Sequence, residues 1–329
     1  IYHHVSTTSD AILHHVIKLE KGADVTVLEN GPAAARFNKV MEIDIADGAG
    51  FHHVRAQGRD HDRRAATHMF ARLGENSTFK SFTLTANGVL TRNECVIELT
   101  GDDAVAHVAG ACVGDGDFHH DDTVFITHDA VNCESRQVFK KVLRNGATGV
   151  FQGKILVKQH AQKTDGYQIS QSLLLDGDSQ FLAKPELEIY ADDVVCSHGS
   201  TSGAIDEDAL FYLRSRGVDE KQATDLLTLA FLAEAVEEIE NEALAEDILA
   251  RLEAWLARRT AGLAPSARVR RDLVTGLWVT AAFFTKFNYG LMLVAVIGLD
   301  GIAELVRSPT RSTIWRSHAV VAAPMAVVC

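Results

Sequence analysis

Cysteine is scarce in this chain, and its arrangement argues against two kinds of small scaffold. The 329 residues include five cysteines, with no pair spaced as CxxC: Cys95, Cys112, Cys133, Cys196 and Cys329. An odd number without that spacing disfavours both a disulfide framework and a structural zinc site. A reducing, cytoplasmic location fits this composition better.

Nucleotide and hydrolase motifs are also missing. The sequence contains no phosphate-cradling GxxxxGK(S/T), no GxSxG nucleophile elbow and no HExxH metal motif. Any dependence on ATP must therefore come from a partner. The formal net charge of −12 argues against nucleic acid as a main partner, because phosphate binding needs a basic surface.

The apolar runs near the C-terminus are too short to span a bilayer. Leu273–Thr285 and Tyr289–Leu299 contain 13 and 11 residues, whereas a membrane helix needs about 20. Joining them would place Lys286 near the bilayer centre, at a cost of about 2.5–3.5 kcal/mol. We expect no membrane segment. We interpret residues 260–329 as a fused or frame-shifted tail and assign it no function.

Short apolar alternations dominate from Val25 to His198. A period of two indicates strands with one buried face, and no long helix interrupts the run. The turns between strands carry Asn-Gly and Asp-Gly pairs, at residues 87–88, 115–116, 145–146 and 176–177. By itself, this pattern is typical of a β-sandwich or β-barrel.

The pattern changes to helical spacing after His198. Asp206 and Asp219 are suited to cap two helices, of which the second keeps its apolar spacing through Ile239. A third helix is predicted from about Glu242 to Arg258. The sequence therefore divides into a β region (1–203), a helical module (204–259) and the unmatched tail (260–329).

Four segments between Gly146 and Val218 carry a family resemblance. They are GVFQGKILV, AQKTDGYQ, KPELEIYADDVVCSHGSTSG and DEDALFYLRSRG. Each resembles a signature of the SufB/SufD family of iron–sulfur cluster assembly proteins, the SufD branch in particular. They also occur in the order and at the spacing of that family, which no general structural rule demands.

The resemblance implies a fold and a function. It implies a right-handed parallel β-helix for residues 1–203, lacking the N-terminal helical region usual in SufD proteins. It also implies a non-catalytic scaffold subunit that pairs with SufB through its last coils. The helical module would bind the SufC ATPase. An iron–sulfur cluster would form transiently at the SufB contact.

Cys196 and His198 are the candidate metal ligands. Residues i and i+2 of a strand share a face, and thiolate and imidazole both suit iron. The resemblance places this histidine at the SufB–SufD contact, with Cys196 near it and SufB supplying the remaining ligands. The alternative is a buried structural cysteine beside a hydrogen-bonded histidine.

Two other polar clusters receive structural interpretations. Histidines and carboxylates gather in FHHDDTVFITH, residues 118–128, but we expect HHDD to form a solvated turn rather than a metal or proton-transfer site. In AQKTDGYQ, Lys163 and Asp165 could form an acid–base pair. We favour a polar turn whose side chains bond backbone groups.

Two further functions stay open from the sequence. One is a SufB-like or homodimeric scaffold that binds a cluster alone, although SufB chains carry further functional cysteines. The other is a β-helix hydrolase or lyase acting on polysaccharides. Such an enzyme needs paired carboxylates and aromatic sugar platforms, whereas this chain has only 23 aromatic residues and no evident carboxylate pair.

Overall fold

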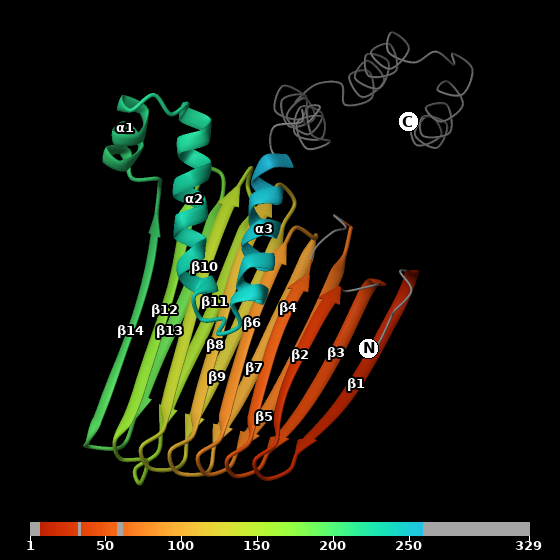
Figure 1. Cartoon of the computed structure of the whole chain (residues 1–329), viewed down its shortest axis with the longest axis vertical. Helices are drawn as coiled ribbons and strands as arrows, with labels where there is room; N and C mark the ends of the chain where they lie inside the picture. The colour runs from red at the N-terminus through yellow and green to blue at the C-terminus, as the bar shows by residue number, and fades with distance from the viewer. Residues whose placement is uncertain (1–6, 32–33, 58–61, 259–329) are drawn as a thin grey trace, which may run out of the picture. The chain divides into compact units, whose positions relative to one another are not determined.

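The computed structural model describes residues 7–31, 34–57 and 62–258. Within these ranges the chain forms strands followed by three helices (Figure 1). The predictions for residues 260–329 lie outside the described residues. The elements are β1 (Thr7–Leu19), β2 (Asp24–Gly31), β3 (Ala34–Ile45), β4 (Gly50–Gln57), β5 (Arg64–Leu73), β6 (Thr78–Ala86), β7 (Leu90–Leu99), β8 (Val105–Asp115), β9 (His119–His128), β10 (Glu134–Arg144), β11 (Thr148–Val157), β12 (Thr164–Leu174), β13 (Gln180–Ile189), β14 (Val194–Gly203), α1 (Glu207–Ser215), α2 (Glu220–Val236) and α3 (Glu242–Arg258).

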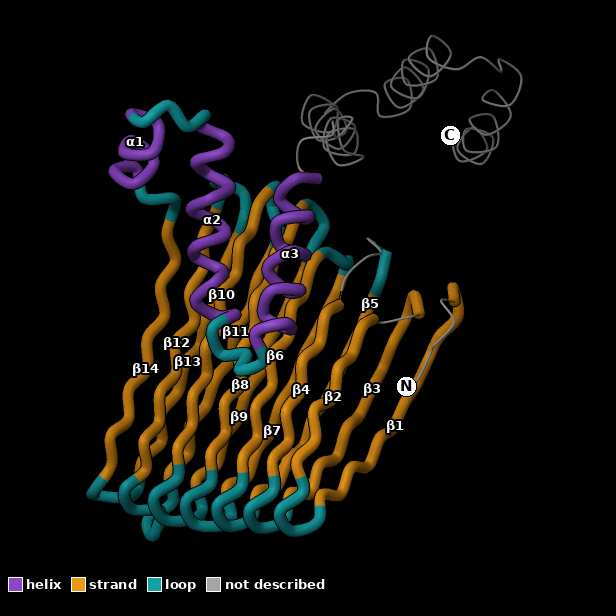
Figure 2. Tube along the Cα trace, in the orientation of Figure 1, coloured by secondary structure: helices purple, strands orange, loops and turns teal. Residues whose placement is uncertain are grey.

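Successive strands alternate between two parallel sheets. Sheet A has the order β1-β3-β5-β7-β9-β11-β13, and sheet B has the order β14-β12-β10-β8-β6-β4-β2. Partners therefore lie one coil apart: Met41 pairs with Met69, 28 residues later. Figure 2 shows the stacked coils. The parallel β-helix expected from the resemblance is confirmed, and the sandwich or barrel that the pattern alone favours is wrong.

Alternation along each strand places every second side chain between the sheets. On sheet A, Met41, Met69, Cys95 and Val124 stack in register, and none is more than 6% exposed. Burying a Met or Val side chain stabilises the fold by about 1.5–3 kcal/mol. The period of two in the sequence thus builds a continuous apolar column along the β-helix.

Asparagine and glycine turn the chain between coils. Asn87 and Asn145 have φ angles of 61° and 55°, and Gly88 and Gly116 have φ angles of 110° and 70°. Asn tolerates this left-handed conformation because its side chain bonds locally, and Gly lacks the Cβ that would clash. The turns predicted at these pairs are confirmed.

Both predicted helix caps are present. The Asp206 carboxylate accepts a hydrogen bond from the Ala209 N–H at 2.9 Å, and Asp219 accepts one from Lys221 at 3.1 Å. Each cap satisfies a backbone donor that the first helical turn leaves unpaired. The second helix ends at Val236 rather than at Ile239, because the chain turns back there to begin α3.

Helices α2 and α3 cover the outer face of sheet B (Figure 1). Leu232 and Trp255 pack with Val54 and Phe82 of the sheet in one buried cluster. The Arg144 guanidinium lies 4.7 Å from the centre of the Trp255 ring, a cation–π contact. None of the described helices is long and apolar enough to cross a bilayer.

Candidate functional site

The last strands of the two sheets, β13 and β14, form the C-terminal end of the β-helix. Among the described strands, β13 pairs only with β11 and β14 only with β12. Figure 1 shows β14 at the opposite end of the stack from β1. Open strand edges are places where another chain can add by backbone hydrogen bonds.

Cys196 and His198 lie together on the inner side of β14. They pair in register with Gly166 and Gln168 of β12. Cys196 is half-buried and His198 is exposed, and β14 ends its sheet, so no further strand covers this face within the described structure. The shared face expected from the i, i+2 spacing is present. That these residues are metal ligands stays a prediction.

Gly166 makes room for the Cys196 thiol. A Cβ at position 166 would lie 3.1 Å from the sulfur, closer than an ordinary van der Waals contact. Burial raises the pKa of the Cys196 thiol, and a backbone hydrogen bond from Gly166 opposes that rise. The thiol is therefore protonated at neutral pH, and it would release its proton on binding a soft metal.

One thiol and one imidazole do not complete a metal site. Within the described ranges, no group of three or more His, Cys, Asp and Glu side chains is placed to hold a metal ion. Iron in clusters usually takes four protein ligands of the Cys or His type. Any cluster bound at Cys196 and His198 thus needs ligands from outside the described chain.

The solvated turn predicted for HHDD is wrong. These residues begin strand β9, and His120, Asp121 and Asp122 are buried. His120 Nε2 lies 2.9 Å from Asp122 Oδ2, and Lys141 forms an ion pair with the same carboxylate. Burial alone would raise the pKa of Asp122, but His120 and Lys141 hold it well below its usual range. His120 and Asp122 are two residues apart and share the inner face of β9, whereas Asp121 lies on the opposite face and accepts a hydrogen bond from Arg92 at 2.6 Å.

A second charged group lies inside the β-helix, nearer its N-terminal end. Glu29 of β2 forms an ion pair with Lys39 of β3 and contacts His53 Nε2 at 2.9 Å. Burial lowers the pKa of Lys39 to about 8. Asn93 connects Arg55 to Asp122: its Oδ1 accepts a hydrogen bond from Arg55 at 2.7 Å, and its Nδ2 donates one to Asp122 at 3.1 Å.

Sequence reasoning missed this polar interior. Lys39, Arg55 and Lys141 sit at positions of the alternation that face the core, and each is at most 5% exposed. The sequence did contain a sign of this interior, because each of these charged residues is an even number of positions away from an apolar residue on the same face of its strand. Lys39 and Lys141 each form an ion pair with a carboxylate. Two nitrogens of the Arg55 guanidinium, Nε and Nη1, have no hydrogen-bond partner within the described structure.

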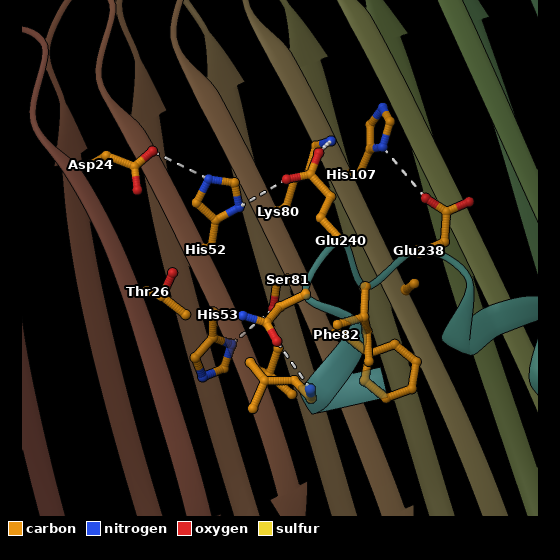
Figure 3. A pocket seen from close by; sticks show the side chains of 15 residues that line it. Asp24, Thr26, His52, His53, Lys80, Ser81, Phe82, His107, Glu238 and Glu240 are labelled. Carbon is orange, nitrogen blue, oxygen red and sulfur yellow. Dashed lines mark hydrogen bonds and ion pairs between the residues drawn. The ribbon is translucent and has the colours of Figure 1, made fainter. Parts of the chain in front are cut away.

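A cavity of about 390 Å³ opens between sheet B and the α2–α3 connection. Figure 3 shows His52, Lys80 and His107 on the sheet facing Glu238 and Glu240 of the connection. Glu240 forms an ion pair with Lys80, and Glu238 lies 3.4 Å from His107 Nδ1. These opposite charges already satisfy one another. The contacts that line the cavity therefore hold the α2–α3 connection against sheet B. No residue of β14 lines this cavity.

The polar turn that we favoured for AQKTDGYQ is present only at its start, residues 161–163, because Thr164 already begins strand β12. Gln162 Oε1 accepts a hydrogen bond from the Asp193 N–H at 2.9 Å, and the Thr164 hydroxyl donates to the Ala161 carbonyl at 3.0 Å. Both bonds hold the turns between coils. Gln168, at the end of the segment, lies instead inside the β-helix on β12 and is fully buried.

Comparison with known proteins identifies the family. The family model described as "SUF system FeS cluster assembly, SufBD core domain" matches residues 3–231, from the region of β1 into α2. The chain belongs to the SufBD family of iron–sulfur cluster assembly proteins. Its β-helix and its first helices together correspond to the family's core domain.

Individual SufBD relatives agree with this assignment. The iron–sulfur cluster assembly protein SufD of Escherichia coli K12 is 32% identical over 246 residues, which cover 72% of this chain and 57% of that protein. A SufBD family protein of Synechocystis is 31% identical over 245 residues, covering 68% and 52%. SufD of Bacillus subtilis is 27% identical over 262 residues, covering 77% and 59%. The chain thus matches between half and three fifths of the length of each of these relatives.

The SufBD signature segments now have places in the fold. GVFQGKILV is strand β11 without its first residue, Thr148, and KPELEIYADDVVCSHGSTSG covers the last six residues of β13 and the whole of β14. DEDALFYLRSRG spans α1. The segments therefore gather around the last coils of the β-helix, the end that carries Cys196 and His198.

Proposed function

We propose that this chain is a SufD-like, non-catalytic subunit of an iron–sulfur cluster assembly scaffold. It pairs with SufB through β13 and β14, and with the SufC ATPase through the helices within residues 204–259. The nascent iron–sulfur cluster is cargo that forms transiently at the SufB contact. The observation that carries the proposal is that Cys196 and His198 lie on the same open face of the last coil.

The SufB contact is supported by two features of this end. The thiol and imidazole are ligands suited to iron but too few to hold a cluster. The open edges of β13 and β14 give a second chain a way to bind directly beside them. A partner that adds there brings its own ligands to within reach of Cys196 and His198.

The SufC contact is supported by helix α1. Phe211 and Tyr212 are 74% and 54% exposed, and no residue of α1 is buried. Helices α2 and α3, in contrast, pack their apolar faces against sheet B. Adjacent exposed aromatics on a helix are typical of a protein-binding surface. The sequence contains no nucleotide-binding motif, so ATP hydrolysis belongs to SufC in this proposal.

The alternative is a SufB-like or homodimeric scaffold, and it differs in a measurable way. A homodimer would load a cluster without SufB, because a second copy would supply the missing ligands. The SufD-like function requires SufB for loading. We propose a cytosolic location for this subunit, as its cysteine composition indicates.

The proposal is tested with His198→Ala and Cys196→Ser in complexes reconstituted with SufB and SufC. His198 is exposed, so its loss removes little packing and the variant chain should still fold. We expect His198→Ala to assemble normally but to bind less iron and sulfide than wild type. The matched control is His14→Ala, an exposed histidine on β1, which should load normally. Normal loading in His198→Ala would reject the proposed site.

A further inference from the structure

A row of polar side chains crosses the last three strands of sheet B on their inner face. Gln137 of β10, Gln168 of β12 and His198 of β14 are consecutive register partners. Gln168 Nε2 donates a hydrogen bond to Gln137 Oε1 at 2.7 Å. Gln137 Nε2 in turn donates to the Lys154 carbonyl of β11, at a long 3.5 Å.

The Lys154 carbonyl fixes the direction of this row. A carbonyl oxygen only accepts, so Gln137 must present its NH₂ group there and its oxygen to Gln168. Gln168 must then give its own NH₂ group to Gln137. This leaves Gln168 Oε1 as a buried acceptor with no hydrogen-bond partner within the described structure.

Gln168 is held in this position by its surroundings. Its side chain is 0% exposed, and its amide occupies the space opposite Gly153 of β11. A Cβ at position 153 would lie only 1.7 Å from Gln168 Nε2. The missing side chain of Gly153 therefore makes room for the amide. An acceptor that is buried, fixed and unpaired costs about 1–3 kcal/mol.

His198 is the donor placed to satisfy this acceptor. It lies beside Gln168 in register, and adjacent strands are about 4.7–4.9 Å apart. The imidazole ring has no hydrogen-bond partner among the described residues, and its exposure leaves it free to rotate. A ring turned toward the β-helix would direct one ring N–H at Gln168 Oε1.

We propose that Gln168 is a positioning residue for His198. Its Oε1 accepts a hydrogen bond from one ring nitrogen and thereby fixes the neutral tautomer. The other nitrogen keeps its lone pair and points away from the β-helix, toward the SufB side. Histidines that bind metals commonly donate their second nitrogen to such a partner. This role rests on the function proposed above for His198.

The tautomer can be measured directly in the isolated chain. Long-range proton–nitrogen NMR correlations distinguish the two ring nitrogens, and His198→Ala assigns the signals. At a pH about 1.5 units above the ordinary imidazole value of about 6.5, we expect one nitrogen of wild-type His198 to carry most of the proton. In Gln168→Leu the tautomer ratio should move by about 2- to 10-fold, the range that one net hydrogen bond supports.

A second variant and a control complete the test. Gln168→Glu keeps an acceptor oxygen beside the His198 ring, so the same tautomer should persist. Ser170→Ala removes a neighbouring buried hydroxyl whose register partner is Ser200, and it should leave His198 unchanged. The positioning role is overturned if wild type and Gln168→Leu give the same ratio, or if Ser170→Ala shifts it equally.

This outcome is separable from that of the proposed function. Normal cluster loading in His198→Ala would reject the function of the site, while a fixed tautomer in the isolated chain would still support the hydrogen bond. Conversely, an unfixed tautomer in wild type overturns the positioning role even if His198→Ala lowers loading. If the proposed function and the positioning role are both correct, Gln168→Leu complexes should bind iron about 10- to 100-fold more weakly than wild type.

Discussion

Lys141 and Asp122 form an ion pair inside the β-helix, where their side chains are 0% and 6% exposed. The pair joins β10 of one sheet to β9 of the other. Neither charge would be tolerated there alone, because transferring an unpaired ion from water costs several kcal/mol. The free-energy cost of burying either charge therefore depends on the presence of the other.

We predict strong coupling between these two residues. Asp122→Asn leaves the Lys141 ammonium without its counter-charge and should lower the free energy of unfolding by about 3–5 kcal/mol. The double variant Asp122→Asn/Lys141→Met removes both charges and should cost clearly less than Asp122→Asn and Lys141→Met added together. Urea unfolding of all four proteins gives the coupling energy. Additive losses would show that the pair is not a unit.

The sequence was informative wherever the determinant is local. The capping carboxylates of Asp206 and Asp219 act within one helical turn, and the shared face of Cys196 and His198 follows from a spacing of two. The stacking of the coils is not local, because each strand pairs with one about 28 residues away. Only the family resemblance distinguished that fold from a sandwich.

The buried charges show why the rest was missed. Asp122 finds Lys141 19 residues later, and Lys39 finds Glu29 10 residues earlier. A pattern analysis treats such residues as solvent-facing, since isolated charges avoid the core. Their burial becomes reasonable only once the coils bring opposite charges together. The unpaired oxygen of Gln168 is equally invisible without the register of β12 and β14.

His128 should make the fold sensitive to acid. Burial lowers the pKa of His128 to about 4, while an unfolded imidazole titrates near 6.5. At a pH between these two pKa values, His128 is protonated in the unfolded chain but not in the folded chain. The free energy of unfolding therefore falls as the pH drops from about 6.5 to about 4. The full effect of such a shift is roughly 3 kcal/mol.

The variant His128→Gln isolates this contribution. Glutamine is able to replace the hydrogen bond of 2.8 Å between His128 Nε2 and the Ser135 hydroxyl, but it does not titrate. Its free energy of unfolding, measured by urea denaturation at several pH values, should fall less steeply below pH ~6.5 than that of wild type, by up to about 1.4 kcal/mol per pH unit. His53 and His120, whose pKa values burial also lowers, keep some dependence in both proteins. Parallel curves would assign the acid sensitivity elsewhere.

The thiols should differ sharply in reactivity. Burial raises the pKa of Cys95 and of Cys112 to about 12, so almost no thiolate is present at neutral pH and alkylation requires unfolding. Cys196 is only half-buried. In a Cys329→Ser background, mass spectrometry after brief iodoacetamide treatment should find Cys196 labelled first. Labelling of Cys95 or Cys112 at a comparable rate would contradict the closed interior.

Helix α1 should carry a large share of the SufC contact. Replacing Phe211 and Tyr212 by serine removes exposed aromatic surface without touching the core, so the thermal midpoint should hardly change. We expect SufC binding, measured by calorimetry, to weaken at least about 10-fold, as for loss of an interface hot spot. Leu226→Ser, a change at the 46%-exposed leucine of α2, tests whether the surface extends beyond α1. Undiminished binding in the double variant would move the SufC contact away from this helix.

Gly153→Ala should disturb both the fold and the site. The new Cβ would lie 1.7 Å from Gln168 Nε2 and 2.7 Å from the Phe151 ring. Gln168 is buried and bonded to Gln137, so it cannot swing aside freely, and overpacking of this kind costs about 1–3 kcal/mol.

Gly177→Ala is the matched control: a Cβ there meets nothing within 4 Å, and the free energy of unfolding should stay within about 0.5 kcal/mol of wild type. If Gly153→Ala folds with its stability reduced, His198 should also lose its fixed tautomer, because displacement of Gln168 takes away the acceptor. Equal unfolding midpoints for the two alanine variants would mean that the space opposite Gly153 is not needed by Gln168.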